Sequence, residues 1–563
     1  MASVPQQEAQ EQEEVVAQQS RLLRSELSEY LDARQERRRL FPMAVLTGGL
    51  AGAVAVGFRL LLNAGEHVRA WLSGQAAQGN SLLALVVPLF CALAAGLSVV
   101  LVRRFAPEAA GSGIPNLEAV LRRLRPMNWR RLLPVKFFGG VLAVGFGGLA
   151  LGREGPTVQM GGAVGDAVAR LFGGNFRDRE TLMMAGAGAG LAAAFNAPLA
   201  GLVFVLEEVQ REFRPLVFGA TLIACVIADV VSRLVFGQNP VFAVPAVVAP
   251  PVGLFPVFCV MGAVIGLLGV GFNRALLTSL DLFGRVAKPV PAWVPAALIA
   301  AVVGVAAMFA PEVAGGGHHL TERALTAEVA LAAIPLWLIG RLLLTLGGYA
   351  SGAPGGIFAP MLALGALIGL GFAGVWNAVL GGIAAPEAFA MVGMAAFFTA
   401  VVRAPLTGIV LIAEMTGGYA LMLPLLGACL AAYAVPESLG DRPIYEALLE
   451  RDLTRSGDAP AAEQPRVLTY RVHEEARFAH RLVRELGLPQ GCILVSLRRG
   501  HAEQVPTAAT RLLPGDRVTV LAAPTVENAA HLLHEGFEMP KRDEGDGSSG
   551  PGGDDPGAGS SAM

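Results

Sequence analysis

The stretch from Phe137 to Gly165, FFGGVLAVGFGGLALGREGPTVQMGGAVG, decides the fold. Glu154 is its one acidic residue, and it lies in apolar, glycine-rich surroundings. A carboxylate at membrane depth is costly unless it is paired, hydrated or protonated, and such residues are usually functional. The neighbouring Gly155 and Pro156 are typical of a broken helix whose N-terminus faces a cavity. The pattern therefore predicts an ion site with a titratable gate.

The composition excludes an ordinary soluble globular protein, because 54% of the 563 residues are hydrophobic and only 16% are charged. A membrane-spanning helix needs roughly 20 apolar residues. Stretches that approach this length are Ser81–Val102, Phe255–Phe272, Val294–Phe309 and Gly418–Val435. We therefore expect an all-α polytopic membrane protein. Several segments are shorter or interrupted, and these must be buried in protein, because lipid offers no hydrogen bonds to an open backbone.

The distribution of charge predicts an orientation. Arginines cluster at 37–39 and again between Arg122 and Arg131, and such clusters favour the cytoplasmic side. Residues 1–36 are polar and contain no cleavable signal peptide. We expect an integral protein of a prokaryotic plasma membrane with both soluble ends in the cytoplasm. The net charge of −2 gives no reason to expect a nucleic-acid partner.

Changes in composition divide the chain into five parts. The expected parts are a cytoplasmic segment (1–40), a transmembrane domain (41–455), a linker (456–465), a small α+β cytoplasmic domain (466–537) and a disordered tail (541–563).

Within the small domain, alternating apolar residues predict three strands and two short helices. The strands are expected at Val467–Val472, Cys492–Leu497 and Arg517–Leu521, and the helices at Phe478–Leu486 and Val526–His534.

The transmembrane domain contains an internal repeat. The segment APLAGLVFVLE at 197–207 matches APLTGIVLIAE at 404–414, a shift of 207 residues. Pro156 and the glycines after it match Pro360 and its following glycines at a shift of 204. The repeat predicts two related halves, about 41–235 and 255–437, and transporters of this kind often have inverted halves. Glu207 and Glu414 occupy equivalent positions, and we expect both to be structural.

Four segments rich in Gly or Pro are expected to begin helices, at 111–115, 152–156, 355–360 and 441–445. A helix N-terminus presents free N–H groups and about half a positive charge. Several such ends could bind an anion without a buried lysine or arginine, and weak binding suits an ion that must also leave. The hydroxyls of Ser112 and Tyr445 could each donate one further hydrogen bond.

Six motifs in order resemble the CLC family of chloride channels and proton-coupled chloride transporters. They are GSGIP (111–115), LPVKFFGG (133–140), GREGPTVQMGG (152–162), AAFNAPLAG (193–201), SGAPGGIFAPMLALG (351–365) and RAPLTGI (403–409). The resemblance covers roughly residues 40–450 and implies a homodimer in which each subunit has its own anion pathway.

The resemblance also implies roles for individual residues. Ser112, Tyr445 and the backbone N–H groups of Ile357 and Phe358 would surround a central chloride. Glu154 would be the gate, because its carboxylate would compete with chloride for an outer site. Gly155 would supply a backbone donor at that site. The serine in GSGIP implies chloride as the preferred anion.

Glu208 distinguishes two mechanisms within the family. Proton-coupled members have a glutamate at the matching position, whereas passive channels usually have an apolar residue there. Chloride/proton antiport is therefore the expected function, with a passive voltage- or ligand-gated chloride channel as the alternative. A structural role at a helix end remains open for Glu208, as does simple capping for Ser112 and an interfacial position for Tyr445.

Other chemistry finds little support in the sequence. The chain has no GxSxG or HExxH motif, so we expect no enzymatic activity and no cofactor. The five cysteines and the pair His318-His319 lack the spacing of a metal site. Glu118 and Lys136 are expected to pair with each other as packing or subunit-contact residues.

The C-terminal module resembles TrkA-C, the ligand-binding subdomain of potassium-conductance regulators. The resemblance rests on the strand 492–497, Arg-Gly at 499–500, Val-Pro at 505–506 and Pro-Gly-Asp at 514–516. It implies a regulatory, dimer-stabilising domain that binds a small ligand such as a cyclic dinucleotide. Arg498, Arg499 and His501 could meet its phosphates, although solvated turn residues are an equally simple interpretation of the three.

Overall fold

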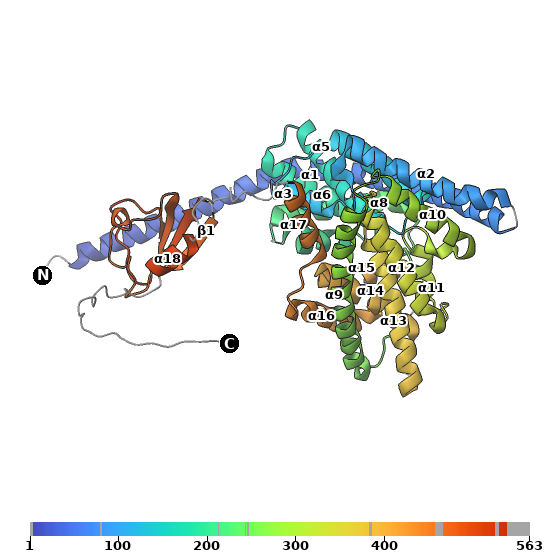
Figure 1. Cartoon of the computed structure of the whole chain (residues 1–563). Coiled ribbons are helices and arrows are strands. Elements are labelled where there is room, and N and C mark those ends of the chain that lie inside the picture. The colour runs from blue at the N-terminus through green and yellow to red at the C-terminus, as the bar shows by residue number, and fades with distance from the viewer. Residues whose placement is uncertain are drawn as a thin grey trace, which may run out of the picture. The chain divides into compact units, whose positions relative to one another are not determined.

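The computed structural model describes residues 4–78, 81–211, 213–242, 244, 247–381, 385–456, 466–500, 502–523 and 529–537. The proposed tail, most of the proposed linker and His501 lie outside these residues. Contacts divide the chain into two compact units, Met1–Asp452 and Leu453–Met563 (Figure 1). The first unit is helical and the second contains a sheet.

The first half of the helical unit is a succession of α-helices. They are α1 (Val4–Ala77), α2 (Ser81–Phe105), α3 (Ile114–Leu121), α4 (Trp129–Gly140), α5 (Glu154–Leu171), α6 (Phe176–Phe195), α7 (Pro198–Phe204) and α8 (Pro215–Phe236). Two of them continue as π-helical turns, α4 through Val141–Phe146 and α7 through Val205–Gln210.

The second half follows the same order. Its helices are α9 (Phe255–Val286), α10 (Val294–Phe309), α11 (His318–Leu325), α12 (Ile334–Ala350), α13 (Phe358–Leu380), α14 (Pro386–Val402), α15 (Pro405–Thr416) and α16 (Met422–Ser438), and α17 (Ile444–Ser456) comes next. Among the described residues, seven helices are long and apolar enough to cross a membrane. The chain is therefore an integral membrane protein.

The repeat includes a further pair of segments that was not predicted. Within the described residues, each half has eight α-helices. The segment APEAAGSG at 106–113 matches APEVAGGG at 310–317, again at a shift of 204. Each segment contains a short 3-10 helix and ends on a glycine with φ of 88° that precedes an eight-residue helix, α3 or α11.

Two carboxylates show how the halves are related. Glu207, just after α7, accepts hydrogen bonds from the backbone N–H groups of Leu406 (3.0 Å) and Thr407 (2.7 Å) at the start of α15. Glu414, near the end of α15, accepts from Leu199 (3.2 Å) and Ala200 (2.8 Å) at the start of α7. The two equivalent helices are therefore antiparallel. A two-fold axis across them relates the halves, which are inverted as the sequence predicted.

Glycines allow the central helices of each half to pack at backbone distance. A Cβ on Gly161 of α5 would lie 2.0 Å from the carbonyl oxygen of Gly186 in α6. The equivalent contact joins α13 to α14, where a Cβ on Gly365 would lie 2.6 Å from the carbonyl oxygen of Gly393. This packing of small residues fixes the helix starts that precede α5 and α13.

The second unit is a four-stranded antiparallel sheet. Its order is β1-β4-β2-β3, with β1 at Arg466–Arg471, β2 at Cys492–Arg499, β3 at Ala502–Gln504 and β4 at Arg517–Ala522. The three predicted strands are confirmed, and β3 was not predicted. Helix α18 spans Ala529–Phe537, close to the predicted position.

The helix predicted at Phe478–Leu486 is wrong. The backbone N–H groups there bond to distant segments: Phe478 to Gly536 (3.0 Å), His480 to Leu512 (2.9 Å) and Val483 to Thr510 (2.9 Å). The Phe478 ring packs edge-on against Phe537 at 4.9 Å. These tertiary contacts replace helical hydrogen bonds, and only a 3-10 turn remains at Val483–Glu485.

Candidate functional site

Backbone hydrogen bonds join three of the predicted helix-start motifs. Gly152 and Gly356 exchange two of them, at 2.6 and 2.8 Å, and the N–H of Gly355 donates to the carbonyl of Gly111 at 3.0 Å. The starts of α3, α5 and α13 therefore meet at one place, although they are up to about 245 residues apart in sequence.

Ser112 lies at the start of α3, against the start of α5. A Cβ on Gly155 would lie 2.3 Å from the Ser112 Oγ atom, so only glycine lets the two segments approach this closely. The Ser112 hydroxyl is buried and faces the Tyr445 hydroxyl, and no described residue forms a well-formed hydrogen bond with it. A buried polar atom without a partner needs an explanation, and a bound ion is one.

Lys136 holds the loop that carries Ser112. Its Nζ atom is fully buried and donates to the carbonyl oxygens of Ala109 (2.9 Å) and Gly111 (2.7 Å). Glu118 instead contacts Arg122 at 3.4 Å. The predicted pair of Lys136 with Glu118 is therefore wrong within the chain, because the Lys136 ammonium donates its hydrogen bonds to backbone carbonyl oxygens of the tight loop instead.

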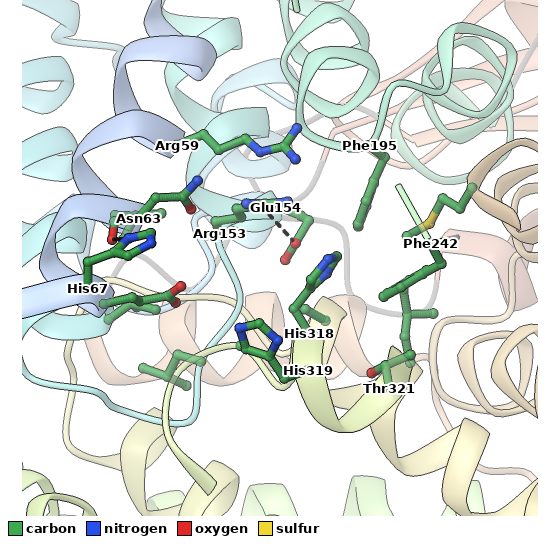
Figure 2. Close-up of a pocket in the computed structure, with 18 residues that line it drawn as sticks. Arg59, Asn63, His67, Arg153, Glu154, Phe195, Phe242, His318, His319 and Thr321 are labelled. Carbon is green, nitrogen blue, oxygen red and sulfur yellow. Dashed lines mark hydrogen bonds and ion pairs between the residues drawn. The ribbon is translucent and has the colours of Figure 1, made fainter. Parts of the chain in front are cut away.

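Glu154 is the first residue of α5, and its side chain is almost completely buried. The backbone N–H groups of Arg153, Glu154 and Ala359 face its carboxylate. Arg153 Nε lies 3.8 Å from Glu154 Oε1 (Figure 2), and Oε2 has no hydrogen-bond partner among the described residues. The carboxylate thus occupies the place where the starts of α5 and α13 would hold an anion.

Tyr445 brings a fourth helix start to the site. It is the second residue of α17 and is completely buried. Its hydroxyl faces the Ser112 hydroxyl and interacts electrostatically with Tyr349, Glu208 and Glu154. No described residue forms a well-formed hydrogen bond with it. Two hydroxyls and one carboxylate oxygen are therefore buried together, and none of the three has a well-formed hydrogen bond within the described part of the chain.

Ile357 and Phe358 begin α13, as the sequence predicted for this motif. Phe358 packs against the rings of Phe195 and Phe398 at 5.3 and 4.6 Å, which fixes the helix start beside the site. Ala359 was not predicted as a site residue, but its N–H is the α13 donor that faces Glu154. Its place in the first turn of a helix could have indicated this role.

Glu208 lies in the π-helical turn after α7, close to the start of α17. Its side chain is only 3% exposed, and its nearest ion-pair partner, Arg211, is 3.8 Å away. Arg211 also contacts Glu446 at 3.4 Å and adopts a left-handed backbone with φ of 57°. Glu208 is therefore a weakly compensated buried carboxylate, suited to exchanging a proton.

A cavity of about 270 Å³ borders Glu154 on one side (Figure 2). Arg59, Arg153, Glu66 and the histidines 67, 318 and 319 contribute to its lining. The ring of His318 stacks on Phe242 at 4.6 Å. In the parts of the chain that the structure describes, no group of three His, Cys, Asp or Glu residues could hold a metal ion.

In the second unit, the three residues proposed for a regulatory ligand differ in their surroundings. Arg499 donates to both oxygens of Asp516 at 2.8 Å and to the carbonyl of Arg511 at 2.9 Å. Its guanidinium is therefore engaged within the domain. Arg498 is exposed on β2, and His501 lies outside the described residues.

Comparisons with known proteins agree with this geometry. Residues 91–437 match the sequence profile of the family described as "Voltage gated chloride channel", and residues 467–533 match that of the TrkA-C domain. Two similar relatives are the proteins named H(+)/Cl(-) exchange transporter ClcA of Vibrio parahaemolyticus and Vibrio cholerae. Each is 43% identical over 73% of this chain and 89% of its own length.

Solved structures show the same likeness. The chain is similar to a slow cyanobacterial Cl−/H+ antiporter, with a TM-score of 0.72 and 36% identity over 74% of this chain and 99% of that one. A fluoride/proton antiporter of the CLC type has a TM-score of 0.59 and 23% identity over 71% of this chain and 96% of that one. The second likeness shows the fold alone.

Proposed function

Because the chain belongs to the voltage gated chloride channel (CLC) family, we propose that it is an antiporter that exchanges chloride for protons across a membrane. The observation that carries this proposal is the position of Glu154. Its carboxylate lies at the starts of α5 and α13, where backbone N–H groups face it, beside two buried hydroxyls to which no described residue gives a well-formed hydrogen bond.

The gate follows from competition between two anions for one set of donors. While Glu154 is ionised, its carboxylate takes the N–H groups and blocks the path. A chloride arriving beside it disfavours the ionised form, because like charges repel. Once protonated, the side chain no longer competes for the donors and withdraws. Chloride then contacts Ser112, Tyr445 and the N–H groups of Gly155, Ile357 and Phe358.

Glu208 is the proposed transfer point for protons on the cytoplasmic side. It is a second buried carboxylate, and it would give protons a route to the cytoplasm other than the chloride path. A passive channel needs no such group. Burying a carboxylate without close compensation is costly, which favours exchange over the channel alternative.

The exchanger proposal is tested with purified protein in liposomes, by recording chloride and proton fluxes together. An outward chloride gradient should drive protons inward against their own gradient. A reversal potential that follows chloride alone, with no proton movement, would establish the passive channel instead.

We also propose the setting in which the exchanger works. The arginine-rich loop between α3 and α4 supports an orientation with both soluble ends in the cytoplasm, and the bacterial relatives support a plasma membrane. We propose a homodimer with one pathway in each subunit. Transport by these helix starts and side chains requires no cofactor.

Residues 466–537 are the proposed regulatory domain. Its match to TrkA-C supports a role in dimer stability and in binding a small ligand, with a cyclic dinucleotide as the example. Of the proposed contacts, exposed Arg498 suits a phosphate better than Arg499, which already binds Asp516. Titration of the full-length protein with cyclic dinucleotides would test this part of the proposal.

A further inference from the structure

The cavity next to Glu154, the proposed gate, is also lined by other charged side chains. Arg59 and Arg153 contribute two fixed positive charges to its lining, and Glu66 and Glu154 contribute two negative charges. Figure 2 shows the Arg59 side chain reaching from α1 toward the space beside Glu154 and Arg153. The cavity of about 270 Å³ can hold a hydrated monovalent anion.

Arg59 differs from the other arginines of this region in its contacts. Its Nε and Nη1 atoms are buried, and no described residue accepts a hydrogen bond from either. Arg69, ten residues later on α1, donates Nη1 to the carbonyl oxygens of Val144 and Gly145. Arg153 contacts Glu154 at 3.8 Å and the carbonyl of Ala194 at 3.5 Å. Arg59 is thus a largely buried cation with donors left unused.

The Arg59 guanidinium stacks on an aromatic ring. Its Cζ atom lies 3.9 Å from the centre of the Phe236 ring. Stacking of this kind holds the planar group in place but satisfies none of its N–H donors. Glu154 supplies a counter-charge while it is ionised, but no described residue accepts a hydrogen bond from the buried Nε and Nη1 atoms, so an anion in the adjoining cavity would stabilise Arg59.

We propose that Arg59 forms an anion-binding subsite in this cavity, where a halide waits before it reaches the gate. The subsite rests on the proposed exchange function. While Glu154 is ionised, it offsets one of the two arginine charges. Protonation of Glu154 leaves the pair of arginines facing Glu66 alone, so the cavity attracts chloride most when the gate is able to open.

The subsite predicts a specific change in kinetics. Chloride exchange is measured with radiolabelled chloride in liposomes at equal chloride and equal pH on both sides, so that protein orientation does not matter. Arg59→Gln should raise the KM for chloride about two- to fivefold, the size expected from losing one partly screened charge interaction. The maximal rate should stay within about twofold, because a saturated subsite no longer limits exchange. Arg59→Lys should keep most of the wild-type KM.

Arg104→Gln is the matched control. Arg104 also stacks on a phenylalanine, Phe105, at 5.8 Å, but it is not among the residues that line the cavity. Its KM should equal that of the wild type. An unchanged KM in Arg59→Gln would overturn the proposal. So would equal losses of maximal rate in Arg59→Gln and Arg59→Lys, which would indicate a packing role against Phe236.

A structural measurement covers the case in which Arg59→Gln does not fold. Crystals of the wild-type full chain in bromide should give an anomalous peak in the cavity beside Arg59, and its absence would refute the subsite. Failure of the exchange function is distinguishable, because wild-type protein would then move no protons with chloride. The subsite would fail by itself if wild-type exchange were normal and the bromide peak missing.

Discussion

The two halves of the membrane domain share a backbone plan but differ in the side chains at its key positions. Ser112 and Glu154 of the first half correspond to Gly316 and Phe358 of the second, at the shift of 204 residues. Glu208 corresponds to Met415, at the shift of 207. The symmetric frame supplies helix starts from both halves, whereas every proton-carrying group proposed here belongs to the first.

This difference gives the exchanger its asymmetry. Met415 lines the cavity beside Glu154, while its counterpart Glu208 stands near Arg211 and Glu446. A pair of inverted halves with identical side chains would treat both membrane faces alike. Because Glu154 and Glu208 both belong to the first half, the chloride and proton routes differ between the two membrane faces.

The largest expected effect comes from removing the titratable group at the gate. Glu154→Gln should lower proton flux about a hundredfold, to background, because an amide cannot carry the proton. Chloride flux should continue, since the amide competes weakly for the N–H donors of α5 and α13. Parallel recording of both ions in liposomes checks this. Proton movement that persists in step with chloride would remove Glu154 from the gate.

The second effect concerns the other carboxylate of the first half. Glu208→Gln should reduce proton flux by about tenfold or more while chloride flux survives, because the cytoplasmic transfer point is lost. Glu414→Gln is the control, since Glu414 is a carboxylate that caps α7 and has no proposed proton role. If chloride and proton fluxes fell equally in Glu208→Gln, Glu208 would have a structural role.

The sequence predicts the repeat and the four helix starts because Gly and Pro act locally, through backbone conformation. The residues that it missed act at long range. Ala359 is unremarkable in sequence, and its role depends on α13 meeting α5. Arg59 gains its surroundings from residues far away in the chain. Lys136 was named but assigned the wrong partner, because its acceptors are backbone carbonyls in the loop before α3. The incorrect helix prediction at Phe478–Leu486 has the same origin, because backbone N–H groups there donate to carbonyl oxygens of distant segments.

Glu207 and Glu414 each cap the start of the equivalent helix in the other half, and their contributions to stability can be compared. Glu207 accepts two backbone hydrogen bonds and one from the Thr407 hydroxyl at 2.7 Å, whereas Glu414 accepts two. Replacing either by alanine leaves N–H groups unpaired, at a cost of about 1–3 kcal/mol. Glu207→Ala should therefore lower the unfolding temperature in detergent more than Glu414→Ala. The reverse order would contradict the proposed strength of the two caps.

The smallest expected effect is a change in stability that should be confined to the sheet unit. Burial by itself would raise the pKa of Asp516, but hydrogen bonds from Arg499 and from the Leu513 N–H hold that pKa below its ordinary value. A lowered folded pKa means that the ionised Asp516 stabilises the domain above its unfolded pKa of about 3.9, and that this stability is lost as the pH falls through the folded value.

We expect Asp516→Asn to destabilise residues 466–537 by about 1 kcal/mol at pH 7, a modest value because Arg499 is partly exposed to solvent. Hydrogen exchange of the full-length protein, read out by mass spectrometry, should show faster exchange in β2 and β4 but not in α5 or α13. The difference from wild type should shrink below about pH 4, as Asp516 becomes protonated in both states. A difference that stayed constant down to pH 2 would mean that the charge of Asp516 contributes nothing and that its shape alone matters.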